Sequence, residues 1–187
     1  MLDVALKEWA VVCDLLLAGR LTLLLRKGGI HEAKGPGVFE LEHPRFVLYR
    51  TWAHQRAEML KATVASGVEP RAEPATLTLD GVGEATHIGP VPSRAAIDEL
   101  DDLHCWSAAQ IDMRWAYKPE RPLYVVAVRA YRLASPRVIA NHAEYAGCRS
   151  WVPLRPGDEV DDAAAVPVLD DAAYAACVSR MAAAITP

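Results

Sequence analysis

The chain has 187 residues, of which 52% are hydrophobic and 24% are charged, and its formal net charge is −4. This is the composition of an ordinary globular domain, and it excludes a disordered tail, a collagen-like fibre and a highly charged linker. No apolar run approaches the roughly 18 residues of a transmembrane helix, and the N-terminus lacks the basic and apolar segments of a signal peptide. We therefore expect a cytoplasmic protein with no membrane contact.

The charges are unevenly distributed, which bears on the choice of partner. A net negative charge excludes a whole-molecule field that attracts nucleic acid. The acidic residues gather near the C-terminus, where a single base, Arg180, accompanies Asp158, Glu159, Asp161, Asp162, Asp170 and Asp171. Because the rest of the chain is close to neutral, the sequence remains compatible with a local basic patch.

The four cysteines, Cys13, Cys105, Cys148 and Cys177, form no C-x-x-C pair. Reduced thiols are therefore expected. A zinc site built from Cys148, Cys105 and His104 is disfavoured, because metal sites usually bring two ligands close together on one turn. The sequence accordingly predicts no metal and no cofactor.

Hydrophobic periodicity and turn residues predict the elements of the fold. In chain order they are a helix at 2–18, strands at 21–26 and 45–50, a helix from Thr51 to Gly67, strands at 76–79 and 84–88 with a turn at 81–83, a helix beginning at Ser93 that continues to Tyr117 or breaks at Ser107, a strand at 122–133 ending at Ser135-Pro136, a strand at 150–154 and a helix at 170–185. The strand at 122–133 has the clearest alternation.

Strands and helices are mixed without regular strand–helix–strand units, so a doubly wound parallel sheet is not expected. We predict an α+β fold in which two or three helices flank a curved or partly closed mixed β-sheet. The predicted single domain spans residues 1–155, and residues 156–187 form a Pro/Asp/Ala-rich linker and a C-terminal helix.

Two clusters of residues are suited to anions. Arg26 and Lys27 precede Gly28-Gly29, where backbone N–H groups can approach an anion closely. His54 follows the end of a strand, at a predicted helix N-terminus, and its imidazole is also a candidate acid or base. Each cluster is equally compatible with a structural role, as a glycine turn with solvated charges or as a capped helix.

A third cluster interleaves aromatic and basic residues, namely Trp106, Arg114, Trp115, Tyr117, Lys118, Arg129, Tyr131 and Arg132. Aromatic rings can stack on bases while arginine holds phosphate. Alternatively, Trp106 and Trp115 belong to the core and the arginines pair with acidic residues. A fourth cluster, Glu144–Trp151, contains a cysteine and a serine but no G-x-S-x-G elbow, which is more typical of a structural loop.

Four blocks occur in order along the chain: KEWAVVCDLLLAGRLTLLLRKGGIHE, HPRFVLYRTWAHQ, RPLYVVAVRAYRL and EYAGCRSWVPL. Together they resemble a bacterial family known as domain-of-unknown-function family 1802. The resemblance covers roughly residues 3–155, and it implies no established activity.

A more distant resemblance is to the ASCH and EVE branch of the PUA-like β-barrels, carried by Gly19, Arg26 and the Leu133–Pro136 step. The ASCH signature G-x-K-x-x-E-x-R is matched at Gly19 and Arg26, whereas Leu21 and Leu24 replace its Lys and Glu. The resemblance implies a PUA-like barrel that binds RNA or modified bases in a cleft. Some members hydrolyse a base amide with that Lys, so its loss here leaves binding as the implied function.

We hypothesise a non-catalytic module that binds nucleic acid or a nucleotide-like ligand in a cleft through Arg26, Lys27, His54, Trp106, Trp115, Arg129 and Arg132. This requires folding to gather cationic and aromatic side chains on one concave surface. One alternative is a metal-dependent nuclease or other hydrolase that uses Glu32, Glu40, Glu42, His43 and His54. The other is a structural or protein-interaction domain whose contact is the acidic C-terminal segment.

Overall fold

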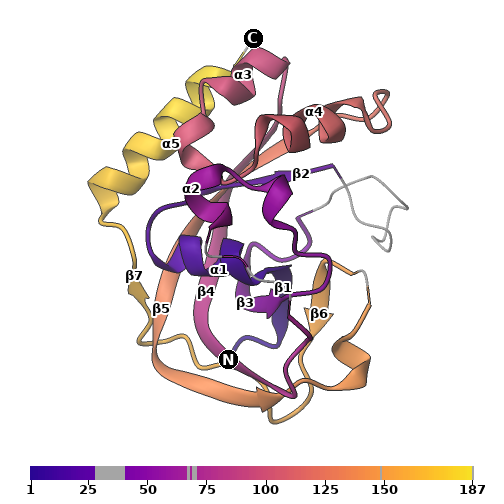
Figure 1. Cartoon of the computed structure of the whole chain (residues 1–187). Coiled ribbons are helices and arrows are strands. Elements are labelled where there is room, and N and C mark those ends of the chain that lie inside the picture. The colour runs from indigo at the N-terminus through magenta and orange to yellow at the C-terminus, as the bar shows by residue number, and fades with distance from the viewer. Residues whose placement is uncertain (28–40, 67, 69–70, 148, 187) are drawn as a thin grey trace.

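The computed structural model describes residues 1–27, 41–66, 68, 71–147 and 149–186, and their strands form one curled sheet, an open half-barrel (Figure 1). The strands are β1 (Val4–Trp9), β2 (Leu23–Arg26), β3 (Arg45–Thr51), β4 (Thr76–Pro90), β5 (Tyr124–Ala140), β6 (Trp151–Pro153) and β7 (Val166–Pro167). The α-helices are α1 (Ala10–Leu17), α2 (Ala62–Ala65), α3 (Arg94–Asp98), α4 (Ala108–Ala116) and α5 (Asp171–Ile185). Short 3-10 turns occupy Ala57–Met59, Asp101–Leu103 and Ala143–Tyr145.

The strands lie in the order β2-β5-β4-β3-β1-β6, and β7 pairs with β5. Among the described strands, β1 and β3 are parallel and the other neighbours are antiparallel. This mixed, curled sheet with its helices confirms the predicted α+β fold. The parallel register places Trp9 opposite Thr51, so the C-terminal ends of β1 and β3 meet at one edge of the sheet.

Local sequence signals correctly predicted several elements. The strands at 21–26, 45–50, 122–133 and 150–154 correspond to β2, β3, most of β5, and β6. Ser93, Ser107 and Asp170 each accept a hydrogen bond from the N–H group three residues later, and so begin α3, α4 and α5. The sequence did not decide whether the helix that begins at Ser93 continues to Tyr117 or breaks at Ser107. It breaks, and the Ser107 side chain caps the start of a new helix, α4.

The helix predicted over residues 2–18 is wrong in its first half, which forms β1. Strand β1 pairs with β3 on one side and with β6 on the other. Its Ala5 and Leu6 side chains belong to two separate core clusters, as expected for a strand that is covered on both faces. A strand with two apolar faces cannot be told from a buried helix by periodicity alone, and α1 begins only at Ala10.

The second predicted helix, from Thr51 onward, is also wrong. Thr51 is the last residue of β3, and α2 is only four residues long. The Glu73 carboxylate accepts hydrogen bonds from Thr51 Oγ1 and from the N–H groups of Trp52 and Ala53. Glu73, which is distant in sequence, thus accepts hydrogen bonds from N–H groups that would have no partner at a helix N-terminus. These bonds hold the segment as a turn.

Strands β4 and β5 each run through a point where the sequence predicts a break. The predicted turn around Gly83 is wrong, because this glycine allows a close approach inside β4: a Cβ atom there would lie 2.5 Å from Phe46 Cε2. The predicted end of β5 at Pro136 is wrong as well. Residues 133–136 have no partner in the β4 ladder, so the missing N–H of Pro136 costs no ladder hydrogen bond.

Helix α5 packs against β4, β5 and α3, along the side of the sheet where Figure 1 draws it in yellow. Tyr174 and Met181 are its buried side chains, and the Tyr174 hydroxyl lies 2.7 Å from Thr86 Oγ1. Arg180 Nη2 lies 2.6 Å from a carboxylate oxygen of Asp102, beyond α3. Every helix in the described part of the chain is too short or too polar to cross a membrane.

Candidate functional site

A cavity of about 710 Å³ opens at the edge of the sheet where β1 and β3 end. Strand β1 supplies Lys7, Glu8 and Trp9, while Arg26 comes from β2 and Arg114 from α4. The turn after β3 and the loop between β5 and β6 complete the walls. The site is therefore assembled from segments that the sheet topology brings together from most of the chain.

The inner end of the cavity is built around an ion pair in which Arg26 Nη2 donates to Glu8 Oε1. Arg26 Nη1 also lies 3.3 Å from Ser150 Oγ, which ties the end of β2 to the residue before β6. The Arg26 and Glu8 side chains are only 17% and 11% exposed. Charges so poorly solvated act on one another, and on a ligand, more strongly than charges in bulk water.

Arg114 and Trp106 complete this inner end. The Arg114 guanidinium carbon lies 4.0 Å from the centroid of the Trp106 ring, a cation–π contact, and Nη1 donates a 2.9 Å hydrogen bond to the carbonyl of Leu25. Burial lowers the pKa of Arg114 to about 10, so the group still carries its charge at neutral pH. Trp106 itself is 4% exposed and also meets Trp9 edge-on, with ring centroids 5.1 Å apart.

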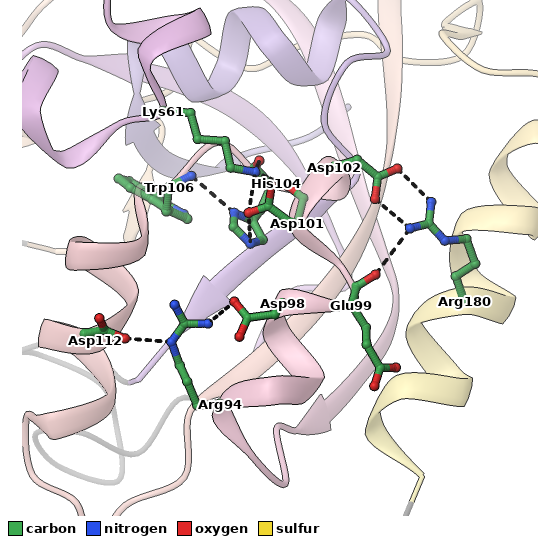
Figure 2. A network of polar contacts seen from close by, with 10 residues as sticks. All are labelled: Lys61, Arg94, Asp98, Glu99, Asp101, Asp102, His104, Trp106, Asp112 and Arg180. Carbon is green, nitrogen blue, oxygen red and sulfur yellow. Dashed lines mark hydrogen bonds and ion pairs between the residues drawn. The ribbon is translucent and has the colours of Figure 1, made fainter.

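A polar network behind Trp106 fixes its backbone, as Figure 2 shows. The Trp106 N–H donates to His104 Nδ1 at 3.2 Å, and Lys61 Nζ donates to the His104 carbonyl at 2.8 Å. Lys61 also forms a 3.0 Å ion pair with Asp101. Burial, and then the nearby Lys61 charge, lower the pKa of His104 to about 4, which keeps the imidazole neutral and able to accept this bond.

His54 stands at the open rim of the cavity, exposed to solvent. Its φ angle is +61°, in the left-handed region that a residue with a side chain seldom adopts. The Glu73 carboxylate holds the two preceding N–H groups, and the Gln55 N–H donates to the Trp52 carbonyl at 3.2 Å across the turn. The strained backbone of His54 is thus maintained by contacts around it, as is common at functional sites.

The segment that follows β5 lines the cavity with His142 and Tyr145, which contact the C-terminal segment. His142 Nε2 lies 3.6 Å from Asp158 Oδ2, and its Nδ1 lies 3.2 Å from Arg155 Nη1. The Tyr145 hydroxyl donates to Asp158 at 2.6 Å, and burial together with this bond raises the pKa of Tyr145 to about 12. Both His142 nitrogens therefore lie near side chains of the C-terminal segment, and these contacts hold this wall of the cavity against that segment.

The structure brings three of the seven sequence-predicted site residues, Arg26, His54 and Trp106, to this one cavity. The other four do not line it. Lys27 donates to the carbonyls of Arg114 and Trp115 at 2.9 and 2.8 Å, and so caps the end of α4, while Trp115 packs against the larger core cluster. Arg129 bonds to Asp171, and Arg132 donates to the Leu17 carbonyl at the end of α1.

Sequence reasoning missed Lys7, Trp9 and Arg149 as candidates, and it placed Arg114 only in the wider aromatic cluster. The helical interpretation of residues 2–18 concealed Lys7 and Trp9. Their two-residue spacing puts them on one face of a strand, and this was the signal that could have identified them.

Of the residues of the hydrolase alternative, Glu42, His43 and His54 lie in the described chain, and they form no metal centre with its other residues. Glu42 and His43 line a second cavity of about 460 Å³, which shares Arg149 and Ser150 with the first. Among the described residues, no group of three or more His, Cys, Asp or Glu side chains is placed to hold a metal ion. The remaining candidate positions, Glu32, Glu40, Gly28, Gly29 and Cys148, lie outside the described residues.

Comparison with known proteins gives a family and a set of distant structural similarities. The family model described as "Domain of unknown function (DUF1802)" matches residues 5–180. The crystal structure of ASCH from Zymomonas mobilis is 13% identical, with a TM-score of 0.49 over 83% of this chain and 89% of that one. A serine-to-alanine mutant of the same protein is 14% identical, with a TM-score of 0.49 over 84% and 94% of the two chains. No curated protein matches the chain.

Proposed function

The chain belongs to the DUF1802 family, described only as a domain of unknown function, and we propose that it is a non-catalytic module that binds nucleic acid or a nucleotide-like ligand in the 710 Å³ cavity. A cavity of this size falls in the range of small-molecule sites, which have about 300–1,000 Å³. The proposal concerns binding, because the described lining offers a charged and aromatic surface and no metal cluster.

The charge of the cavity carries the proposal. Its described lining includes the cationic side chains of Lys7, Arg26, Arg114 and Arg149, and the carboxylates of Glu8 and Glu73. Four positive charges therefore face two negative ones, although the whole chain carries a net charge of −4. A local excess of positive charge in a concave, partly desolvated site favours an anionic ligand.

The aromatic side chains support a ligand with a planar ring, but they limit how it binds. Trp106 and Tyr49 are 4% and 2% exposed, and Arg114 already covers the Trp106 ring. Trp9 is half-buried and His54 is exposed, so these two rings offer accessible surface in the cavity. We therefore expect a base to stack at Trp9 and His54, with its phosphate toward the arginines.

The alternative of an interaction domain with an acidic tail finds less support. Asp162 Oδ2 lies 2.6 Å from Arg45 Nε, Asp171 pairs with Arg129, and Asp158 accepts the Tyr145 hydroxyl. These acidic side chains hold the C-terminal segment against the rest of the molecule. Asp158 and Asp162 are also poorly exposed and therefore less available to a partner protein, whereas Asp171 remains exposed.

The test is binding by fluorescence anisotropy, with a labelled single-stranded RNA of about ten nucleotides and a DNA of the same sequence as probes. Tryptophan fluorescence follows binding of the four ribonucleoside 5′-monophosphates. Affinity for the RNA is expected to fall steeply between about 50 and 500 mM salt, because phosphate contacts release counterions. Arg149→Gln and Trp9→Leu should each weaken binding about tenfold.

The matched control is Arg132→Gln, which removes an arginine outside the cavity. This variant should bind as the wild type does. The proposal is overturned if none of these probes binds, or if affinity is independent of salt and the two cavity variants match the control.

A further inference from the structure

We propose that Arg114 makes the inner end of the cavity a pocket for a terminal phosphate, so that the ligand is a nucleotide, or a nucleic-acid strand end, that carries a phosphate monoester. This inference rests on the proposed function and narrows it to one chemical class. It assigns a specific anion-binding role to a residue that sequence reasoning did not select.

The first observation is that Arg114 forms no ion pair with a carboxylate among the described residues. Its hydrogen bond goes to the neutral carbonyl of Leu25, and none of the ion pairs among the described residues includes it. The nearby Glu8 carboxylate already accepts from Arg26. The Glu8 charge, which Arg114 shares with Arg26, offsets only part of the cost of burying two guanidinium groups, and a bound anion would offset more of it.

The second observation is that the fold holds Arg114 in place. Trp106 covers one side of the guanidinium at 4.0 Å, and the network of Figure 2 fixes the Trp106 backbone from behind. Lys27 caps the carbonyls of Arg114 and Trp115 and so secures the last turn of α4. Because the Arg114 guanidinium is already held in position, its side chain loses little conformational entropy when a ligand binds, and this favours binding.

The third observation concerns the neighbours that an anion would meet. Arg26 approaches the inner end from β2, and its contact at 3.3 Å brings the Ser150 hydroxyl alongside. Two guanidinium groups and a hydroxyl suit the three free oxygens of a phosphate monoester, which carries a charge of roughly −1.5 to −2. The Glu8 carboxylate, which accepts from Arg26, offsets part of this positive charge, and the remaining attraction is greatest for the ligand group with the highest negative charge.

The depth of the site favours a terminal group over an internal phosphodiester. The buried Trp106 ring and the Arg26–Glu8 pair close the inner end, whereas His54 and Arg149 at the other end are exposed. An internal phosphodiester must have chain leading away from it on two sides. A terminal phosphate has chain on one side only, so it can reach the poorly exposed Arg26–Glu8 pair more easily than an internal phosphodiester can.

The experiment compares ligands with and without a terminal phosphate by isothermal titration calorimetry. The probes are adenosine, its 5′- and 3′-monophosphates, inorganic phosphate, and a short RNA with and without a 5′-phosphate. In the wild type, the phosphate should tighten binding at least about tenfold. The mononucleotide and strand-end probes distinguish the two sources of the same phosphate group.

Arg114→Gln should abolish the gain from the terminal phosphate, whereas affinity for adenosine, which carries no phosphate, should fall far less. Arg114→Lys, which keeps the charge but loses the fork of donors, should retain part of the gain. Arg132→Gln again serves as the control outside the cavity. If Arg114→Gln fails to fold, stabilisation of the wild type by inorganic phosphate in thermal unfolding, and its reduction in Arg114→Lys, provide the same test.

The outcomes separate this inference from the proposed function. Equal affinity for phosphorylated and unphosphorylated ligands in the wild type, or a gain that persists in Arg114→Gln, overturns the terminal-phosphate pocket and leaves base binding intact. Binding of inorganic phosphate alone, without binding of any nucleotide or RNA, overturns the proposed function and the nucleotide class of ligand, and leaves only an anion pocket at Arg114. Absence of all binding overturns both.

Discussion

The Tyr49 hydroxyl donates a 2.6 Å hydrogen bond to Asn141 Oδ1, and this contact joins β3 to the segment that follows β5. The Asn141 amide nitrogen donates in turn to the Pro74 carbonyl at 2.9 Å. Lys7, from β1, lies over the Tyr49 ring and donates to the carbonyls of Tyr145 and Gly147. The walls of the cavity are thus fastened by polar contacts between segments that are distant in sequence.

Asn141→Ala should destabilise the protein by about 1–3 kcal/mol, because it leaves the buried Tyr49 hydroxyl without an acceptor. Tyr49 is 2% exposed, so water cannot easily replace the amide. The same substitution in a Tyr49→Phe background should cost less, since no hydroxyl is then left unsatisfied. Urea unfolding of the wild type, both single variants and the double variant measures the coupling. Strictly additive effects would contradict the relationship.

Gly83→Ala should destabilise the protein more than Gly89→Ala, although both glycines lie in β4. A Cβ atom at Gly83 would meet the Phe46 ring at 2.5 Å and Val128 at 3.0 Å, inside the core. At Gly89 it would meet the end of the flexible Ile185 side chain near the end of α5. We expect losses of about 2–3 kcal/mol and about 1 kcal/mol or less, respectively, in urea unfolding. The reverse order would show that α5, and not the sheet core, is the tightly packed contact.

The stability of the protein should fall as the pH is lowered from about 6.5 to about 4, because of His104. Its pKa is near 6.5 in the unfolded chain and about 4 when buried beside Lys61, even with Asp101 nearby. The unfolded state therefore binds the proton more readily over this interval, and the loss reaches about 3 kcal/mol at most. Above pH 6.5 the contribution of His104 is fully present.

His104→Asn tests this dependence, because its amide oxygen can still accept the Trp106 N–H. The free energy of unfolding, measured in urea at a series of pH values between 4 and 7.5, should depend less on pH in this variant than in the wild type. His87→Asn is the matched control, since it removes an exposed histidine and should retain the wild-type profile. An unchanged slope in His104→Asn would show that other groups cause the acid sensitivity.

Interactions within a few residues were open to prediction from the sequence. Ser93, Ser107 and Asp170 satisfy N–H groups three residues away, so their helices begin where a local rule places them. The alternation of residues 122–133 predicted the first part of β5 in the same way. The α+β class follows from such elements, because their order along the chain limits how their apolar faces can be buried together.

The candidate site depended on contacts between residues far apart in the chain. Residues 4–9 form a strand only because β3 and β6 lie on either side, and Thr51 starts no helix because Glu73 takes its neighbours' N–H groups. Which arginines face the cavity was likewise decided by packing: Arg114 turns onto Trp106, while Arg129 is drawn to Asp171. Residues that form such long-range contacts have no fixed spacing in the sequence. Only the tertiary structure could therefore show which residues contact one another.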